Sequence, residues 1–292
     1  EFRRVLFRSI LQKFSRSFPD VALRYGKRLE SFVETPSGVT ATIVDRDSGA
    51  AETIEASYLV GCDGAGSIVR RAIGVELEGK GALGHAINMF FRTPDLLGEC
   101  GKARGTFFVP VDRGGVWANV RVIEPRAGLW RLMVNETARD TTEESVDKNA
   151  YLARALGREM KVEWVDLNIW RRQSVLASSY GRGRVFLAGD ALHQLSPTGA
   201  FGMNTGIGDA VDLGWKLAAT LQGWGGPNLL ASYDAERRPV GKRAVDNATG
   251  FHNAQSGWGD GLEKLPEDSA EDRKSTRLNS SHIPLSRMPS SA

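Results

Sequence analysis

The sequence predicts an α/β protein in which a mostly antiparallel β-sheet lies between two strand–helix segments. Residues 185–188 form a short apolar run bounded by glycines, and apolar residues then recur at helical spacing over residues 207–221. Residues 58–61 form a second apolar run that enters a glycine-rich turn. Between these segments, residues 84–135 are strand-like runs separated by Gly, Pro and Asp turns, which favours an antiparallel sheet.

The N-terminal part is expected to form a small β-meander. Residues 10–18 are compatible with the end of a helix, and Asp47-Ser48-Gly49 supplies a turn. The run at residues 39–44 alternates in polarity and is rich in β-branched residues, as strands are. Extended segments are therefore predicted at residues 21–25, 28–34, 39–44 and 52–55.

The next segment, residues 58–71, reads Tyr-Leu-Val-Gly-Cys-Asp-Gly-Ala-Gly-Ser-Ile-Val-Arg-Arg. It combines a buried strand, a glycine-rich turn and a short helix. A dinucleotide-binding G-x-G-x-x-G fingerprint would need glycine where Val69 stands, so on that criterion alone the signal is weak.

The inserted sheet carries several large side chains that could line an aromatic-binding cavity, although such residues in strands more often form plain core. They are Phe90, Phe107, Phe108, Trp117, Trp130 and Met133. A helix is predicted from Thr142 to residue 156, because Glu143 and Glu144 favour a helix start. Residues 162–174 are predicted to be extended.

The second motif follows the strand at residues 185–188. Gly189 and Asp190 stand where that strand ends, and ligands of open α/β sheets gather at such ends. Asn204 or Thr205 can cap the helix predicted from Ile207, whose start would suit an anionic or electron-rich group. Spacing alone is equally compatible with a tight strand-to-helix turn.

Another helix is predicted over residues 229–245, and it contains the run Tyr-x-x-Glu-Arg-Arg-Pro. We interpret this run as structural, with Arg237 and Arg238 pairing with acidic neighbours and Pro239 bending the helix. No G-x-S-x-G elbow is present, so a serine triad is excluded. His193 is expected to stabilise its loop rather than act as a base.

Composition narrows the class of protein further. The chain has 292 residues and a formal net charge of +3, which argues neither for nucleic acid nor for a membrane partner. Two cysteines exclude a disulfide scaffold and fit a reducing cytoplasm. The four histidines lack metal-ligand spacing, so no metal site is expected. No signal peptide or membrane-length apolar run occurs in the sequence.

Both ends resemble translated adaptor sequence. Residues 1–9 are therefore expected to be a non-native leader, and residues 254–292 a disordered, non-native tail that is rich in Ser, Arg and Pro. On this interpretation the chain is an internal fragment of a longer enzyme.

The two glycine motifs together resemble those of the single-component, p-hydroxybenzoate hydroxylase-like flavoprotein monooxygenases. The resemblance covers residues 10–253 and implies a partial, three-layer FAD/NAD(P)-binding domain with an inserted substrate domain. The FAD-binding domain would comprise residues 10–82 and 176–253, and the substrate domain residues 83–175.

The resemblance also implies roles for individual residues. Asp190, after Gly189, would bind the ribityl chain of FAD, and the flavin ring would be contacted mostly through backbone by Pro197, Gly199, Gly202, Met203 and Asn204. The motif containing Asp63, Gly64, Ser67 and Arg70 would lie near the pyrophosphate and help to bind FAD and NADPH. Gly66 departs slightly from the family pattern. Arg71 is expected on a solvated helix face.

The implied reaction is hydroxylation of a phenolic or other small aromatic substrate by O2, with NADPH or NADH reducing FAD. The flavin would carry the chemistry, so no catalytic side chain is assigned. A related epoxidase, halogenase or reductase and a non-catalytic fragment stay open as alternatives. So do the identity of the aromatic substrate and the formation of a homodimer.

One part of the family pattern is not found. No G-x-G-x-x-G unit precedes Ile10, and in the family this unit holds the adenosine half of FAD. We therefore predict that the isolated chain binds FAD poorly or not at all. Visible absorbance after incubation with FAD and desalting measures this, and strong retention of flavin would contradict the prediction.

Overall fold

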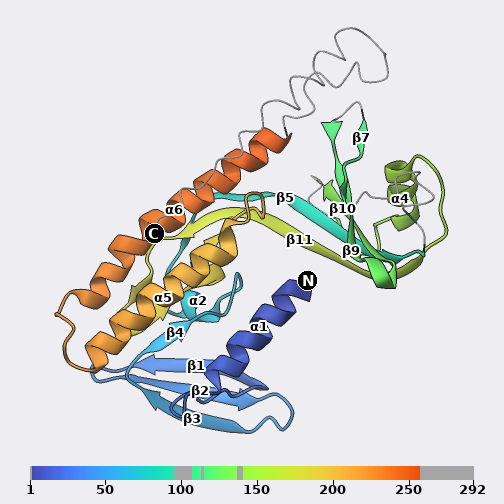
Figure 1. Ribbon diagram of the computed structural model, residues 1–292. Helices are drawn as coiled ribbons and strands as arrows, with labels where there is room; N and C mark the ends of the chain where they lie inside the picture. The colour runs from blue at the N-terminus through green and yellow to red at the C-terminus, as the bar shows by residue number, and fades with distance from the viewer. Residues whose placement is uncertain (1, 95, 97–106, 113–114, 137–140, 257–292) are drawn as a thin grey trace. The chain divides into compact units, whose positions relative to one another are not determined.

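The computed structural model describes residues 2–94, 96, 107–112, 115–136 and 141–256 (Figure 1). The chain divides into two compact units. Unit 1 contains residues 1–83 and 171–250, and unit 2 contains residues 84–170 and 251–292.

Unit 1 begins with helix α1 (Phe2–Ser15) and an antiparallel meander. The meander consists of β1 (Lys27–Glu34), β2 (Val39–Asp45) and β3 (Ala51–Ala56), which confirms the predicted β-meander. The Asp45 carboxylate accepts hydrogen bonds from the backbone N–H groups of Asp47 and Ser48, and so closes the predicted turn. The expected extended segment at residues 21–25 is not a strand.

A three-stranded sheet forms the centre of unit 1, in the order β12 (Gly181–Arg182), β13 (Val185–Leu187) and β4 (Leu59–Gly61). Strands β13 and β4 are parallel, with Leu187 opposite Gly61. Helix α2 (Ile68–Ala72) follows β4, and the 3₁₀ turn η2 (Gly189–Ala191) follows β13. Both predicted glycine motifs therefore leave neighbouring strands at the same edge of the sheet.

Two long helices complete unit 1: α5 (Phe201–Leu221) and α6 (Leu229–Ser256). They lie side by side (Figure 1), and the buried Lys216 ammonium on α5 joins them by donating to Asp212 and to Glu236 on α6. Because both carboxylates compensate its charge, this lysine can be buried without a large penalty.

The start of α5 corrects the prediction from sequence. The helix begins at Phe201, six residues before Ile207, and its N-cap is Ala200 in the left-handed conformation, with φ 57°. Asn204 lies inside the helix, and the Thr205 hydroxyl donates back to the carbonyl of Phe201. Helix α6 likewise continues past the predicted end at residue 245.

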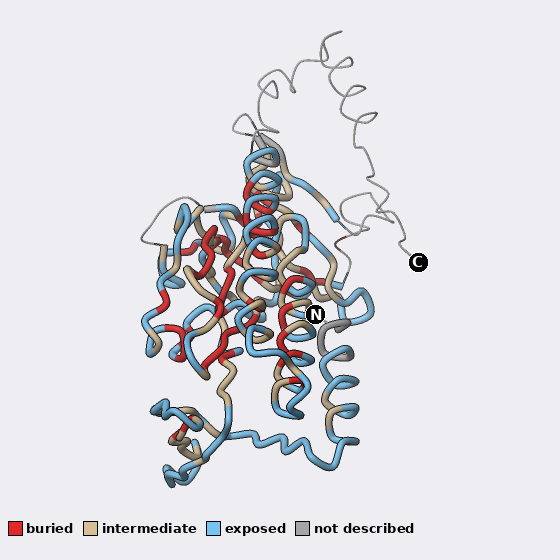
Figure 2. Tube along the Cα trace, turned by 90° about the vertical axis from the view of Figure 1, so that its left-hand side faces the viewer, coloured by how far each residue is buried: buried red, intermediate tan, exposed pale blue. Residues whose placement is uncertain are grey.

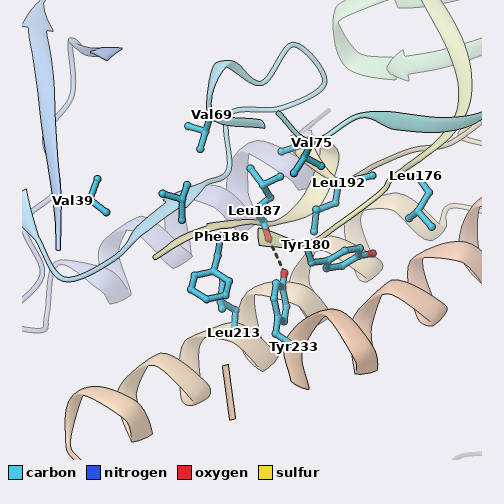
Figure 3. Close-up of a cluster of buried hydrophobic side chains, with 13 residues drawn as sticks. Val39, Val69, Val75, Leu176, Tyr180, Phe186, Leu187, Leu192, Leu213 and Tyr233 are labelled. Carbon is cyan, nitrogen blue, oxygen red and sulfur yellow. Dashed lines mark hydrogen bonds between the residues drawn. The ribbon is translucent and has the colours of Figure 1, made fainter. Parts of the chain in front are cut away.

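The core of unit 1 packs around β13, whose three residues are all buried. Figure 3 shows Tyr233 of α6 pointing at this strand, where its hydroxyl donates to the carbonyl of Leu187 at 2.8 Å. Its ring meets those of Tyr180 and Phe186 edge-on. Helix α6 is thus fixed to the strand that carries the second motif.

Unit 2 is built on an antiparallel sheet. Strand β10 (Leu129–Glu136) lies between β5 (Leu77–Arg92) and β9 (Ala118–Glu124), and β6 (Phe107–Phe108) pairs with β9. The full strand order is β14-β11-β5-β10-β9-β6, in which β11 (Glu163–Ala177) lies beside β5. Strand β14 (His193–Gln194) and the residues of β11 that pair with it, Val175 and Leu176, belong to unit 1. The predicted antiparallel sheet is confirmed. A separate two-stranded ribbon contains β7 (Val111–Asp112) and β8 (Gly115–Val116).

Helix α4 (Lys148–Leu156) corrects a second helix start. Its N-cap is Asp147, whose carboxylate accepts from the N–H of Ala150, and the predicted start at Thr142 lies in a turn. Strand β9 is followed by the short 3₁₀ helix η1 (Pro125–Ala127). Glu143 and Glu144 led to the wrong predicted start. Asp147 caps the helix because an aspartate side chain can accept a hydrogen bond from the free N–H groups of the first turn.

One face of the unit 2 sheet forms its core. Trp130 and Leu132 of β10 are buried there with Leu152 of α4. Buried residues of both units are red in Figure 2. Phe108 and Trp117 pack against this core, as predicted for plain core residues. Phe107 is exposed instead, and alternation along the strands puts Met133 on the opposite face from Leu132.

Candidate functional site

The parallel pairing of β4 and β13 places the two predicted motifs beside each other. Residues 62–67 follow β4, and residues 188–194 follow β13. The carboxyl ends of parallel strands form the usual ligand edge of an α/β sheet. The candidate site therefore lies at this edge of unit 1.

The first loop is held in shape by its own polar side chains. The Ser67 hydroxyl, which is buried, accepts from the N–H of Arg70 and so caps α2. Asp63 Oδ2 accepts from the N–H groups of Ile68 at 2.7 Å and of Val69 at 3.2 Å. Gly64 has φ 78°, a left-handed conformation that suits glycine.

The carboxylate of Asp63 is stabilised by these contacts. Partial burial alone would raise its pKa, but hydrogen bonds from Ser67 and from the backbone N–H groups outweigh burial, and the pKa is lower than that of an ordinary aspartate. Asp63 is thus an ionised cap of α2. Its predicted contact with a cofactor stays a prediction.

Arg70 connects the two loops. Its Nη1 donates to the carbonyl of Ala191 at 2.9 Å, and its Nη2 donates to the carbonyl of Ala65 at 3.2 Å. Gln194 Nε2 donates to the same Ala65 carbonyl at 3.0 Å. Burial lowers the pKa of the Arg70 guanidinium. Arg71 is exposed, as predicted, and the predicted contact of Arg70 with a cofactor stays a prediction.

The turn after β13 packs closely on α5. Gly189 has φ 65°, and a Cβ added to Gly206 of α5 would lie only 3.2 Å from the Cα of Gly189. Asp190 follows, and its side chain is exposed. The absence of a side chain at Gly206 thus permits the close approach of the two backbones.

A buried carboxylate lies behind this turn. Asp209 of α5, with no exposed surface, accepts from Gly189 N at 3.2 Å, from His193 Nε2 at 2.6 Å and from Arg237 Nε at 3.0 Å. The two oxygens of a carboxylate provide enough acceptor sites for all three bonds. Arg238 pairs with Glu78 at 3.2 Å.

These contacts confirm that His193 stabilises its loop and that both arginines pair with acidic residues. Our sequence analysis missed Asp209. A signal was present, because Thr205, Asp209 and Leu213 recur every four residues and share the buried face of α5. A charged residue at such a position needs partners in the core.

The remaining predicted residues surround the N-terminus of α5. Pro197, Gly199, Met203 and Asn204 are exposed, and a Cβ added to Gly202 would meet no atom within 4 Å. Among the described residues no side chain caps α5. The positive end of the helix dipole therefore lies beside these exposed residues.

Unit 2 has polar groups on the sheet face opposite its core. Asn88 Oδ1 and Arg131 Nε are buried without a hydrogen-bond partner among the described residues. Asn88 donates to Asn168 at 3.1 Å, and Arg131 Nη2 donates to Asn119 at 3.3 Å. Burial lowers the pKa of Arg131. Unsatisfied buried groups of this kind need an explanation such as a ligand or water.

Two parallel strands end here in glycine turns that are joined by hydrogen bonds from Arg70 and Gln194. This arrangement is typical of the α/β proteins that bind nucleotide cofactors. Residues 5–248 match the family described as FAD binding domain. The chain therefore belongs to the family of FAD-dependent aromatic monooxygenases, and the predicted family, the fold class and FAD as the cofactor of the family are confirmed.

Three known proteins illustrate the relationship. A relative from Streptomyces coelicolor, provisionally named a polyketide hydroxylase, is 41% identical over 230 residues, which are 75% of this chain and 35% of the relative. The rebeccamycin biosynthetic enzyme RebC with reduced flavin superposes with a TM-score of 0.72 at 37% identity, covering 87% of this chain and 48% of RebC. Aklavinone-11 hydroxylase with FAD and aklavinone gives 0.71 at 30% identity, covering 83% and 46%. The chain thus spans less than half of each.

Two further findings concern the described residues only. They contain no cluster of three or more His, Cys, Asp or Glu side chains suited to a metal ion. None of their helices has the length and apolar character needed to cross a membrane.

The lowered pKa of Asp63 predicts a pH-dependent contribution to stability. A carboxyl whose pKa is lowered by folding stabilises the fold above its unfolded pKa of about 3.9, and this stabilisation is lost as the pH falls through the folded value. Asp63→Asn should therefore unfold more easily than wild type at about pH 6, and the difference should shrink as the pH falls below the unfolded pKa and through the lower folded pKa. Urea unfolding across this range measures it. A difference that stays constant with pH would contradict the assignment.

Proposed function

We propose that this chain supplies the ribityl and flavin-ring side of the FAD site of an aromatic hydroxylase that uses O2 and NADPH or NADH. One observation carries the proposal. The exposed Asp190 and the uncapped first turn of α5 stand at the same strand end, because Gly189 packs directly on Gly206.

The donor set of this edge fits a flavin. A free carboxylate at Asp190 can accept hydrogen bonds from ribityl hydroxyls. The N–H groups that begin α5, with the helix dipole, can stabilise electron density at the carbonyl edge of the ring. Gly199 and Gly202 present bare backbone, which allows a flat ring to approach.

The bound flavin would supply the redox chemistry. The residues of this chain would hold it and limit the access of water. For the substrate, we infer that the polar face of the unit 2 sheet contacts oxygen substituents of an aromatic ring, since Arg131 Nε is a free donor and Asn88 Oδ1 a free acceptor. The aklavinone of the related hydroxylase is an example of the substrate class.

The reaction is tested with the full-length protein, FAD and a panel of phenols and larger aromatic compounds. We expect NADPH or NADH consumption that depends on O2 and on the aromatic compound, with a hydroxylated product detected by mass spectrometry. An epoxide or halogenated product, or consumption independent of O2, would contradict the hydroxylase assignment.

The site itself is tested by Asp190→Ala. Loss of the carboxylate should weaken FAD binding about tenfold or more, because a charged hydrogen bond contributes about 1.5–3 kcal/mol. Flavin fluorescence titration measures this, up to millimolar FAD if binding is weak.

Glu55→Ala is the matched control, since Glu55 is an exposed acid on β3. It should bind FAD as wild type does. Equal affinities for wild type and Asp190→Ala would exclude Asp190 from the site.

A further inference from the structure

Asp209 occupies an unusual place for a carboxylate: it has no exposed surface and lies beneath the turn that carries Asp190. Burying a charge is costly unless it is paired and fully hydrogen-bonded. Arg237 supplies the pairing charge at 3.0 Å, and its Nη2 also donates to the carbonyl of Thr205. Gly208 leaves room for that guanidinium, because a Cβ there would lie 2.6 Å from Nη2.

The partners of Asp209 come from three other elements. Gly189 belongs to η2, His193 to β14 and Arg237 to α6. The carboxylate is thus the common acceptor that fixes the η2 turn on the side of α5. Stability alone does not require this arrangement, since an apolar cluster of similar volume is often as stabilising as a buried ion pair.

The packing of η2 on α5 cannot set the position of the turn by itself. The contact is made by Gly189 and Gly206, which have no side chains to interlock. A contact between two glycine backbones allows several relative positions of the turn and the helix. Hydrogen bonds have preferred distances and angles, so they select one of these positions. Asp209 provides these bonds from the helix side, as Arg70 does through the carbonyl of Ala191 from the α2 side.

We propose that Asp209 is a positioning residue for the flavin: its buried carboxylate sets where Asp190 and the first turn of α5 stand relative to each other. The proposal rests on the flavin site inferred above. Asp209 does not touch the cofactor; it acts through Gly189, one residue before Asp190, and through the helix whose N-terminus faces the ligand.

The test substitution is Asp209→Asn. It keeps the volume but leaves one carbonyl oxygen for three donors and turns an amide N–H towards one of them. Asp212→Asn is the matched control. Asp212 lies on the same helix and bonds to Lys216, which keeps Glu236 as a second partner. The control therefore removes the same charge without touching η2.

The first readout needs no flavin. Hydrogen exchange of the Gly189 and Leu192 amides, which hold the η2 turn, should become about tenfold faster in Asp209→Asn and stay unchanged in Asp212→Asn. The second readout is FAD affinity, which should fall about tenfold in Asp209→Asn only. The visible circular dichroism of bound FAD should change as well, because the groups around the flavin ring would have moved. A variant that is only less stable would leave this spectrum unchanged, so the readout separates the two cases.

If Asp209→Asn does not fold, Gly206→Ala tests the same idea. Its Cβ would press on Gly189 Cα at 3.2 Å and displace the turn while leaving Asp209 intact. We expect weaker FAD binding with unchanged thermal stability, since alanine favours the helix. Unchanged FAD affinity in this variant, with the Gly189 amide signal shifted to show that the turn has moved, would overturn the positioning role.

The two proposals fail in different ways. If, in the full-length protein, neither wild type nor Asp212→Asn binds FAD, the proposed flavin site is wrong and the positioning role falls with it. If wild type binds and Asp209→Asn binds equally well with an unchanged dichroism spectrum, only the positioning role is wrong.

Discussion

The parallel pairing of β4 with β13 is the constraint on which the candidate site depends. Three residue pairs join strands that are more than 120 positions apart, and both glycine motifs then leave the sheet at one edge. Arg70 and Asp209 fix the loops that follow, one from α2 and the other from α5. Without this pairing, each motif would be an isolated turn.

The polar groups at this edge divide into two kinds. Ser67, Arg70 and Asp209 face inward and have their hydrogen bonds satisfied within the protein, as buried polar groups must. Asp190 faces outward beside the N-terminus of α5 and keeps bonding capacity for a ligand. The buried groups Ser67, Arg70 and Asp209 hold the loops in place, and the exposed Asp190 can bind a ligand.

Much of this arrangement could be predicted from sequence, because strands and motifs have local patterns. The apolar run at residues 185–188 predicted strand β13. The Arg-Arg pair of α6 predicted ion pairs, and the structure shows them between Arg237 and Asp209 and between Arg238 and Glu78. The start of α5 could not be predicted, since it depends on Ala200 adopting a left-handed conformation that alanine rarely takes. Asp209 escaped notice because a lone acid in a helix is usually solvated, and only the tertiary partners show otherwise.

The central claim is that the edge formed by the loops after β4 and β13 holds the flavin ring and the ribityl chain of FAD. Glycine-labelled chain, titrated separately with FMN and with ADP and followed by NMR, tests it most directly. The account predicts that millimolar FMN shifts the amide signals of Gly189, Gly199 and Gly202, while ADP leaves them in place. Shifts of these glycines with ADP and none with FMN would contradict it.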